Sequence, residues 1–396
     1  MLFAKLNDLS IGGKGSYGIA ASAVERKADL PTYLRITDIF DDGTLNLSEL
    51  KSVDAPNSDK YILKPNDIVF ARTGGSTGRN YFYDGSDGVF VYAGFLIKFS
   101  IDPEKVNPKY VKYYCRSKQY NDWVQSFNTG STRGNINAQI FGNMEIPLPE
   151  RKQQDYLVSI LEPIDEKIRN NKQVNDNLEQ QAQAIYHERF ETVSPNDLPS
   201  EWRIVTLGEV ATISNKSFNP LKEPEILLEH YSIPAFDEAR FPVFELSTSI
   251  KSNKFIIDAS CFMISKLNPT TKRVWKPYCL TGNAVCSTEF IVYKAKDKTI
   301  TDFLYSVIDS NSFSDFMCSH VTGSTGSRQR TTPSDTLSYE LILPSEDELA
   351  EFQSLVSPMY AQIRINAIEN DRLKRLRDSL LPKLMSGEID VSAVQF

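Results

Sequence analysis

The chain has 396 residues, of which 41% are apolar and 24% charged, and this composition excludes a disordered, collagen-like or disulfide-dense scaffold. The 44 Lys and Arg residues against 51 Asp and Glu give a net charge of −7, so any site for a polyanion must be local. No segment approaches the roughly 18 consecutive apolar residues of a membrane helix, and five cysteines lack a CxxC pair, so we expect a soluble, cytoplasmic protein with reduced thiols.

Short strands and turns are expected in the first 150 residues. Apolar and β-branched runs predict strands at 67–71, 88–92 and 95–99, and a helix is expected at 108–114. A TGST sequence at 129–132 then precedes a short apolar strand, MEIPLP, at 144–149.

A heptad pattern follows in residues 151–192. Apolar and asparagine residues recur at alternating spacings of four and three: Leu157, Leu161, Ile164, Ile168, Asn171, Asn175, Leu178, Ala182 and Ile185. This seam of 29 residues predicts a helix about 43 Å long. The helix is expected to stop before Pro195, in a linker at 194–199.

The same order of elements returns in residues 193–345. Trp202 opens a run at 202–213 that suits a strand and a turn, and a helix is expected at 301–307. A second TGST sequence at 322–325 precedes the strand YELILP at 339–344.

A second heptad helix is expected in residues 346–396. Its seam consists of Phe352, Val356, Met359, Ile363, Asn366, Asn370, Leu373, Arg377 and Leu380. Pro382 is expected to end this helix, and residues 386–391 are expected to form a short extended tail that packs back on the protein.

The two halves are an internal repeat. An offset of 195 residues pairs Pro149 with Pro344 and Asn171 with Asn366, and an offset of 193 pairs the TGST sequences. Two copies of nearly 200 residues indicate a duplicated domain and exclude a solenoid. The bodies between the matched segments share little sequence, which suggests one fold that presents two different recognition surfaces.

Each long helix is the natural partner of the other. The connection between them allows either direction, but in the antiparallel arrangement the midpoints Asn171 and Asn366 would face each other. Those two residues, with Asn175 and Asn370, would then form a polar layer that fixes the register. The alternative is that the asparagines lie at the edge of the seam, in water.

The loops of both bodies carry the positive charge that is available for a ligand. Arg reads guanine, Asn and Gln read adenine, and Ser, Thr and backbone amides reach phosphates, so these loops suit duplex DNA. The candidates in the first body are Lys14, Tyr17, Arg72, Thr73, Ser76, Thr77, Arg79, Arg133 and Asn135. Those in the second are Lys216, Lys266, Asn268, Lys272, Arg273, Trp275, Arg328, Gln329 and Arg330. Taken alone this inventory is weak, because such loops are often only solvated turns.

No catalytic motif is recognised. The glycine-rich segments at 12–16 and 74–78 lack the spacing of a phosphate loop, and no cofactor fingerprint or amino-methylation motif is present. The three histidines have no ligand spacing, and the charges of Glu162, Asp165 and Glu166 are interpreted as a solvated helix face.

Two bodies, each followed by a strand that ends in proline and a heptad helix, resemble the specificity subunit of type I restriction-modification systems. The phrases that carry the resemblance are PLPERKQQDYLVSILEPIDEKI, LPSEDELAEFQSLVSPMYAQI, LPSEWRIVTLGEVATI and LKRLRDSLLPKLMSGEIDV. Within the bodies YLRITDIFDDGTL, PNDIVFARTGGSTG, LLEHYSIPAFDE and ISKLNPTTKRVW are similar to target-recognition segments. One departure is the abrupt start at Leu2, without the lead-in seen at 198–202.

The resemblance implies a mixed α/β fold with target-recognition domains at 1–150 and 193–345 and spacer helices at 151–192 and 346–396, paired as an antiparallel coiled coil. It implies a non-enzymatic chain that binds no cofactor and reads a bipartite, asymmetric DNA target. Two modification subunits would methylate adenine with S-adenosylmethionine, and restriction subunits would use ATP and Mg²⁺. A helix of about 43 Å corresponds to roughly 12 base pairs, and would act as a ruler. The rival readings are a coiled-coil scaffold without a DNA role and an enzyme with an unrecognised site.

Overall fold

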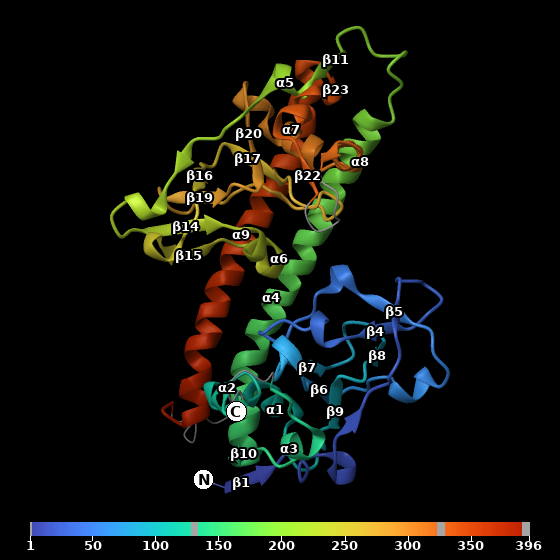
Figure 1. Cartoon of the computed structure of the whole chain (residues 1–396), viewed down its shortest axis with the longest axis vertical. Coiled ribbons are helices and arrows are strands. Elements are labelled where there is room, and N and C mark those ends of the chain that lie inside the picture. The colour runs from blue at the N-terminus through green and yellow to red at the C-terminus, as the bar shows by residue number, and fades with distance from the viewer. Residues whose placement is uncertain (1, 128–133, 323–328, 390–396) are drawn as a thin grey trace. The chain divides into compact units, whose positions relative to one another are not determined.

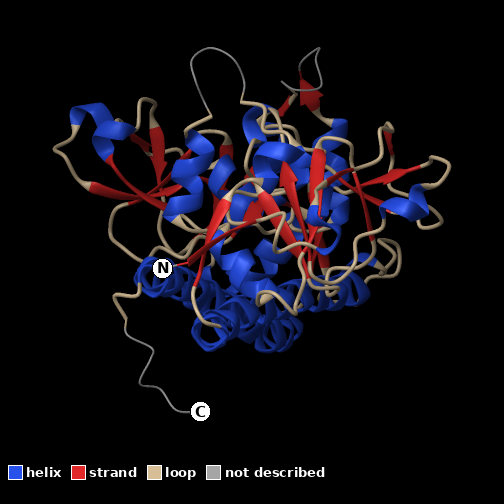
Figure 2. Cartoon of the chain, turned by 90° about the horizontal axis from the view of Figure 1, so that it is seen from below, coloured by secondary structure: helices blue, strands red, loops and turns tan. Residues whose placement is uncertain are grey.

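The structure is a computed structural model that describes residues 2–127, 134–322 and 329–389 (Figure 1). The chain divides into two compact units. Unit 1 comprises Met1–Glu166 and Leu373–Phe396, and unit 2 comprises Lys167–Arg372. Each unit contains one body, residues 2–150 or 193–345, and a part of each long helix. Figure 2 shows that the strands of the bodies are short and alternate with helices and loops.

The first body is built on two four-stranded sheets. One has the order β2-β9-β6-β7, with strands Ser16–Tyr17, Leu96–Ser100, Asp67–Ala71 and Asn80–Tyr83. The other has the order β3-β5-β4-β8, with strands Ala23–Val24, Lys51–Val53, Thr32–Leu34 and Phe90–Tyr92. A separate pair joins β1 (Leu2–Lys5) to β10 (Glu145–Leu148). The helices are α1 (Pro108–Tyr114), α2 (Lys118–Gln125) and α3 (Ala138–Gly142).

The second body repeats this plan. One sheet has the order β12-β20-β17-β18, with strands Ala211–Ile213, Phe290–Ala295, Cys261–Ser265 and Val274–Trp275. The other has the order β13-β16-β19-β14-β15, with strands Ser217–Phe218, Lys254–Ile256, Ala284–Ser287, Leu227–Tyr231 and Val243–Leu246. Two pairs join β11 (Arg203–Thr206) to β23 (Glu340–Leu343) and β21 (Val321–Thr322) to β22 (Arg330–Thr331). The helices are α5 (Leu207–Val210), α6 (Ile233–Ala239), α7 (Thr301–Ile308) and α8 (Asn311–Ser319).

The repeat extends to the capping of individual helices. The hydroxyl of Ser117 accepts a hydrogen bond from the Tyr120 amide at the start of α2, at 3.2 Å. Ser310, which lies 193 residues later, accepts one from the Phe313 amide at the start of α8, at 3.1 Å. A cap of this kind satisfies an amide that the first helical turn leaves without a partner. The expected mixed α/β fold with an internal repeat is therefore confirmed.

The two long helices are α4 (Arg151–Tyr186) and α9 (Glu346–Ser386), drawn in green and red in Figure 1. A π-helical turn, His187–Glu191, follows α4. The expectation that Pro382 ends the second helix is wrong. Leu381, Leu384 and Met385 are buried in the core of unit 1, and this burial outweighs the hydrogen bond that a proline removes from the helix.

Gly387 follows α9 with a φ of 75°, a left-handed conformation that commonly ends a helix. Ile389 packs against the core of unit 1. The rest of the expected tail, residues 390 and 391, lies outside the described part of the chain.

The asparagines of the seam meet inside unit 2. The Asn171 amide donates a hydrogen bond to Asn370 at 2.9 Å, and the Asn366 amide donates one to Asn175 at 2.8 Å. As the residue numbers rise along α4, those of the bonded partners on α9 fall, so the two helices run antiparallel here. Asn171 thus pairs with Asn370, which lies one helical turn from Asn366, the partner that the midpoints of the seams predicted. The role of the four residues in fixing the register stays a prediction.

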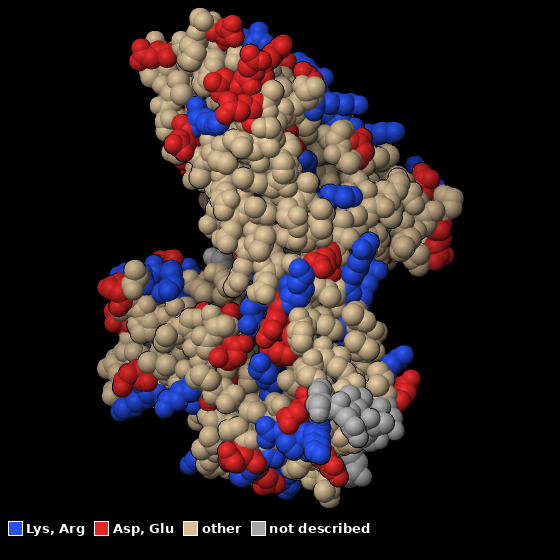
Figure 3. All heavy atoms as spheres, turned by 180° about the vertical axis from the view of Figure 1, so that it is seen from behind, with Lys and Arg blue, Asp and Glu red and all other residues tan. Residues whose placement is uncertain are grey.

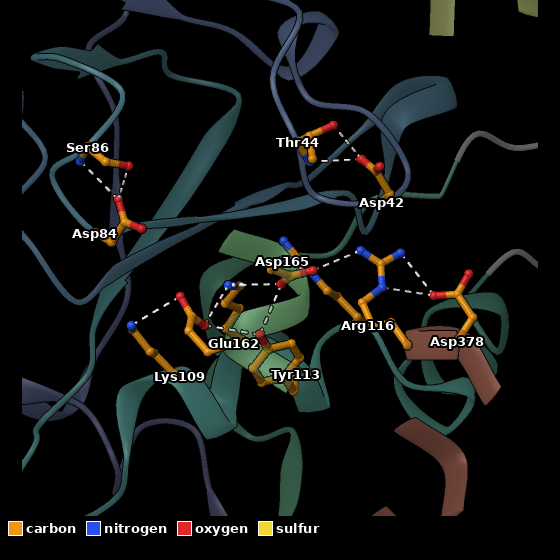
Figure 4. Close-up of polar contacts among 12 residues, drawn as sticks. Asp42, Thr44, Asp84, Ser86, Lys109, Tyr113, Arg116, Glu162, Asp165 and Asp378 are labelled. Carbon is orange, nitrogen blue, oxygen red and sulfur yellow. Dashed lines mark hydrogen bonds and ion pairs between the residues drawn. The ribbon is translucent and has the colours of Figure 1, made fainter. Parts of the chain in front are cut away.

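A buried ionic cluster joins the first body to the long helices within unit 1 (Figure 4). We call it the first joint, and its residues are Lys109, Lys112, Tyr113, Arg116, Glu162, Asp165 and Arg377. Asp165 is the centre, with Lys112 at 3.2 Å, Arg116 at 2.9 Å and Arg377 at 3.0 Å. The expected solvated face at Glu162 and Asp165 is therefore wrong, because these carboxylates are only 9% and 10% exposed.

The charges of the first joint shift its pKa values. Burial alone would raise the pKa of Asp165, but Arg116, Lys112 and Arg377 outweigh it and hold that pKa well below its usual range. Burial would likewise raise the pKa of Glu162, and Lys112 and Lys109 lower it instead. Both carboxylates therefore remain ionised in the folded protein under acidic conditions that protonate ordinary carboxyl groups.

At the corresponding place in unit 2, the second joint, a contact between two hydroxyls replaces the central carboxylate. Offsets of 193 and 195 residues place Ser306 where Tyr113 stands and Tyr360 where Asp165 stands. The Ser306 and Tyr360 hydroxyls lie 2.7 Å apart, and Tyr305 packs edge-on against Tyr360 with ring centroids 4.9 Å apart. The repeat therefore keeps the contact between body and helix but changes its chemistry.

Acid is expected to loosen α1 before it loosens α7. The pKa values of Asp165 and Glu162 are lower in the folded state than the values near 4 of an unfolded chain. Their contribution to stability is therefore complete above about pH 4 and is lost as the pH falls through the folded values. Amide hydrogen exchange between about pH 5 and pH 2, normalised to the unstructured rate, should show α1 losing protection first. Equal loss in α7 would contradict this prediction.

Candidate nucleic-acid interface

In the first body the chain leaves the buried strand β6 and meets the segment that follows the first TGST sequence. The Ile136 amide donates a hydrogen bond to the Arg72 carbonyl at 2.9 Å, and Thr73 forms a β-bridge with Asn135. The Thr77 hydroxyl donates to the Gly134 carbonyl at 3.0 Å. These contacts bring together four predicted site residues, Arg72, Thr73, Thr77 and Asn135, in what we call the first node.

Arg72 is held by aromatic rings. Its guanidinium carbon lies 5.2 Å from the ring centre of Tyr17 and 5.7 Å from that of Phe95, distances typical of cation–π contacts. The Tyr17 hydroxyl accepts a hydrogen bond from the Ala138 amide at 3.2 Å, which fixes that ring. Among the described residues no carboxylate pairs with Arg72. Its charge thus remains available for a ligand.

The second body contains the equivalent arrangement, the second node. The Thr331 amide donates to the Lys266 carbonyl at 3.1 Å, and Leu267 forms a β-bridge with Arg330. The Asn268 amide donates to the Gln329 carbonyl at 2.9 Å. Asn268 has a φ of 48°, a left-handed conformation that asparagine tolerates better than most residues. The predicted residues Lys266, Asn268, Gln329 and Arg330 therefore lie together.

The two nodes share a backbone frame and differ in side chains. The Arg72 amide donates to the Phe95 carbonyl at 3.1 Å, and the Lys266 amide donates to the Glu289 carbonyl at 2.9 Å. Phe95 and Glu289 are 194 residues apart and precede the equivalent strands β9 and β20. Sequence reasoning missed both residues, although alignment of the two copies at this offset could have found them.

Several predicted cations are engaged by carboxylates of their own body. Arg79 pairs with Asp41 at 2.7 Å and also donates to the Ile39 carbonyl at 3.0 Å. In the second body the pairs are Lys272 with Asp309 at 3.0 Å, Arg273 with Asp237 at 2.5 Å and Arg330 with Glu289 at 3.0 Å. These pairs orient the side chains and reduce the net charge of the loops. Figure 3 likewise shows basic and acidic side chains interspersed over the face that it draws.

Trp275 must be removed from the predicted interface. It belongs to strand β18 and is only 3% exposed. Its ring packs edge-on against Tyr231 and Phe236, with centroid distances of 4.7 and 5.4 Å. The basic residues before it suggested a surface loop, but the side chain points into an apolar core, where its large ring is stabilised by burial.

The remaining candidates lie apart from the bonded frames of the two nodes or outside the described residues. Lys14 and Lys216 are exposed, and Ser76 is half-buried in the turn that follows β6. Arg133 and Arg328 lie outside the described residues, as do the first TGST sequence and the second from Gly323 onward. The nodes adjoin both of these loops in the chain.

Within the described part of the chain, no three His, Cys, Asp or Glu side chains are grouped so that they could hold a metal ion. No helix among those residues is long and apolar enough to cross a membrane. The five cysteines are free, and Cys115, Cys261 and Cys286 are buried. Burial raises the pKa of the Cys261 thiol to about 11, so this thiol is protonated at neutral pH.

Comparison with known proteins finds sequence similarity to one group of proteins. The family model for the type I restriction modification DNA specificity domain matches residues 26–180. The specificity subunit of the type I restriction enzyme MjaIX from Methanocaldococcus jannaschii is 24% identical over 320 residues, which cover 74% of this chain and 71% of that protein. The HindI specificity subunit from Haemophilus influenzae is 21% identical over 472 residues, which cover 94% of this chain and 98% of that protein.

The fold agrees with these sequence matches. The crystal structure of a type I restriction-modification S subunit from M. genitalium superposes with a TM-score of 0.56 at 16% identity, and the match covers 97% of this chain and 95% of that one. The duplicated body, the long helices and the sequence matches point to the same group of proteins. The chain is therefore similar in sequence to type I restriction-modification specificity subunits, and it shares the fold of one of them.

Proposed function

We propose that the chain reads a bipartite, asymmetric DNA sequence, one half with each body, through the major groove. The observation that carries this proposal is the pair of nodes, in which one backbone frame presents two different sets of side chains. The first set includes Arg72 and Asn135, and the second includes Lys266, Gln329 and Arg330. Arginine, lysine and amide side chains are the groups that distinguish bases in the major groove. Two unlike sets on like frames suit two unlike half-sites.

The long helices are proposed to set the distance between the half-sites. Helix α4 has 36 residues and α9 has 41, and both contribute to each compact unit. At 1.5 Å per residue these helices are about 54 and 62 Å long. The polar layer of Asn171, Asn175, Asn366 and Asn370 supports one register of the pair, because a shift would leave these amides facing apolar neighbours.

Catalysis is proposed to reside in partner proteins. In this proposal two modification subunits dock on the chain and methylate adenine with S-adenosylmethionine, and restriction subunits use ATP and Mg²⁺. The chain itself would bind no cofactor and supply the sequence recognition alone. Several of its loop cations are neutralised by their own carboxylates, so the chain alone offers few charges to phosphates. Most nonspecific affinity would then come from the partners.

Single-molecule methylome sequencing tests the proposed function. Deleting the gene for this chain from a host that retains the modification subunit should abolish methylation at one bipartite motif, and reintroducing the gene should restore it. A coiled-coil scaffold without a DNA role predicts an unchanged methylome, and that result would overturn the proposal. In gel shifts, the isolated chain should bind a duplex with this motif more weakly than the assembled complex does, with a steep loss on added salt. Equal affinities would contradict the proposed division of labour.

A further inference from the structure

Large exposed aromatic rings surround the one arginine of the first node. Tyr17 is 43% exposed and Phe95 is 55% exposed, although each ring lies against the Arg72 guanidinium. The three residues come from the same end of one sheet, because Tyr17 ends β2, Phe95 precedes β9 and Arg72 follows β6. The Nε atom of Arg72 is buried without a hydrogen-bond partner among the described atoms. Ring contacts therefore hold this side chain in place.

The second node braces an arginine by other means. Glu289 stands where Phe95 stands in the first copy, and its two carboxylate oxygens accept hydrogen bonds from the Nε and Nη2 atoms of Arg330, at 3.0 and 3.1 Å. This fork-to-fork contact fixes the plane of the guanidinium. One position in the repeat thus serves as a brace in both bodies, aromatic in one and acidic in the other.

We propose that Phe95 and Glu289 are specificity-determining residues, each of which holds an arginine so that it reads a guanine in the half-site of its own body. Arg72 is the reader in the first body and Arg330 in the second. Guanine presents two acceptors, O6 and N7, that match two arginine N–H groups. The exposed ring of Phe95 contacts the methyl group of a neighbouring thymine. This inference rests on the proposed function, because it requires that the bodies read DNA.

The brace matters because a free arginine can adapt to several ligands. An arginine side chain loses considerable rotamer freedom when it is fixed, and the brace removes that freedom before DNA binds. A guanidinium held in one plane cannot turn to meet a base with a different pattern of acceptors. Removal of the brace should therefore reduce discrimination between bases more than it reduces affinity for DNA in general.

The test uses the chain assembled with its modification subunits and duplexes that carry each of the four base pairs at every position of both half-sites. The wild-type complex should prefer guanine at one position of the first half-site by about 5- to 150-fold. The variant Phe95→Ala should reduce that ratio several-fold and weaken the preference for thymine beside it, while the second half-site keeps its ratios. The matched control Phe95→Trp, which retains an aromatic ring, should keep the guanine preference.

Glu289→Gln and Glu289→Ala provide the reciprocal test. Both variants should reduce the guanine preference in the second half-site only, with the larger effect for alanine, which removes both acceptors. The unaffected half-site shows that each variant complex is folded and assembled. Unchanged ratios for Phe95→Ala and Glu289→Ala, or a loss equal at all positions, would overturn the role of the braces. A wild-type complex without any bipartite preference would instead overturn the proposed function.

Discussion

Replacement of Asp165 by asparagine is expected to destabilise unit 1 by about 3–5 kcal/mol, the cost of breaking a buried ion pair by removing one partner. Asp165 faces Lys112, Arg116 and Arg377, whose side chains are 6%, 14% and 10% exposed. Asparagine has nearly the same shape but no charge. The three cations would therefore stay buried close together with less compensation, and their mutual repulsion would act against the folded state.

The matched control is Tyr360→Phe in the second joint, which removes the hydroxyl that meets Ser306 and changes no charge. Its expected cost is about 1 kcal/mol, typical of one hydrogen bond. Because two units need not unfold together, native-state hydrogen exchange of α1 and of α7 is a better measurement than one melting temperature. If the two variants lost similar amounts of unfolding free energy, the charges of the first joint would not contribute to its stability.

A heptad inserted into both long helices is expected to lengthen the spacer of the DNA target by about three base pairs while the half-sites stay the same. The insertions would follow Glu166 in α4 and Arg372 in α9, at the division between the units. Seven residues add about 10.5 Å and rotate the following helix by only about 20°, so the buried faces are retained.

The measurement is methylome sequencing of a host with the lengthened chain and the modification subunit. An insertion into α4 alone is the control, because the Asp165–Arg377 contact and the asparagine contacts could then no longer form in the same pair of helices, and methylation should be abolished. If the complex with both helices lengthened still methylated the original motif, the proposal that the helices set the spacing would be contradicted. Changed half-sites would show that the insertion disturbs the bodies themselves.

The duplication, the long helices and most of the predicted strands could be read from the sequence because they depend on local periodicity. The strand at 67–71 and the helix at 108–114 have the predicted bounds. The seam asparagines also meet, as the heptad spacing indicated, although Asn171 pairs with Asn370 rather than with Asn366. The spacing of residues along one helix does not determine the axial register of its partner helix.

Contacts between distant parts of the chain could not be predicted in this way. Asp165 and Glu162 have the spacing of an exposed helix face, and the Arg377 that makes Asp165 a buried residue is 212 positions away. Pro382 breaks helices by its local chemistry, but the buried side chains around it favour a continued helix. Composition alone also cannot separate Trp275, which faces the core, from neighbouring cations that face water.

Among the candidate site residues, the sequence indicated which loops carry polar and basic side chains but not which of them have partners. Arg79 and Arg273 appear equivalent to Arg72 in the sequence, yet each is paired with an aspartate. Phe95 and Glu289 were missed because neither is basic. Their importance depends on the backbone contacts that place them beside Arg72 and Arg330.

The division of the chain has a consequence for its synthesis on the ribosome. Unit 2 is a continuous segment, whereas the core of unit 1 includes Leu381, Leu384 and Met385, which are made long after the first body. The 220 residues that separate Glu166 from Ser386 require about 11–44 s at a rate of 5–20 residues per second. The body that emerges first thus waits with part of its apolar surface uncovered, and unit 2 can fold in the interval. The half of the protein that is translated earliest is therefore the half whose core is completed last.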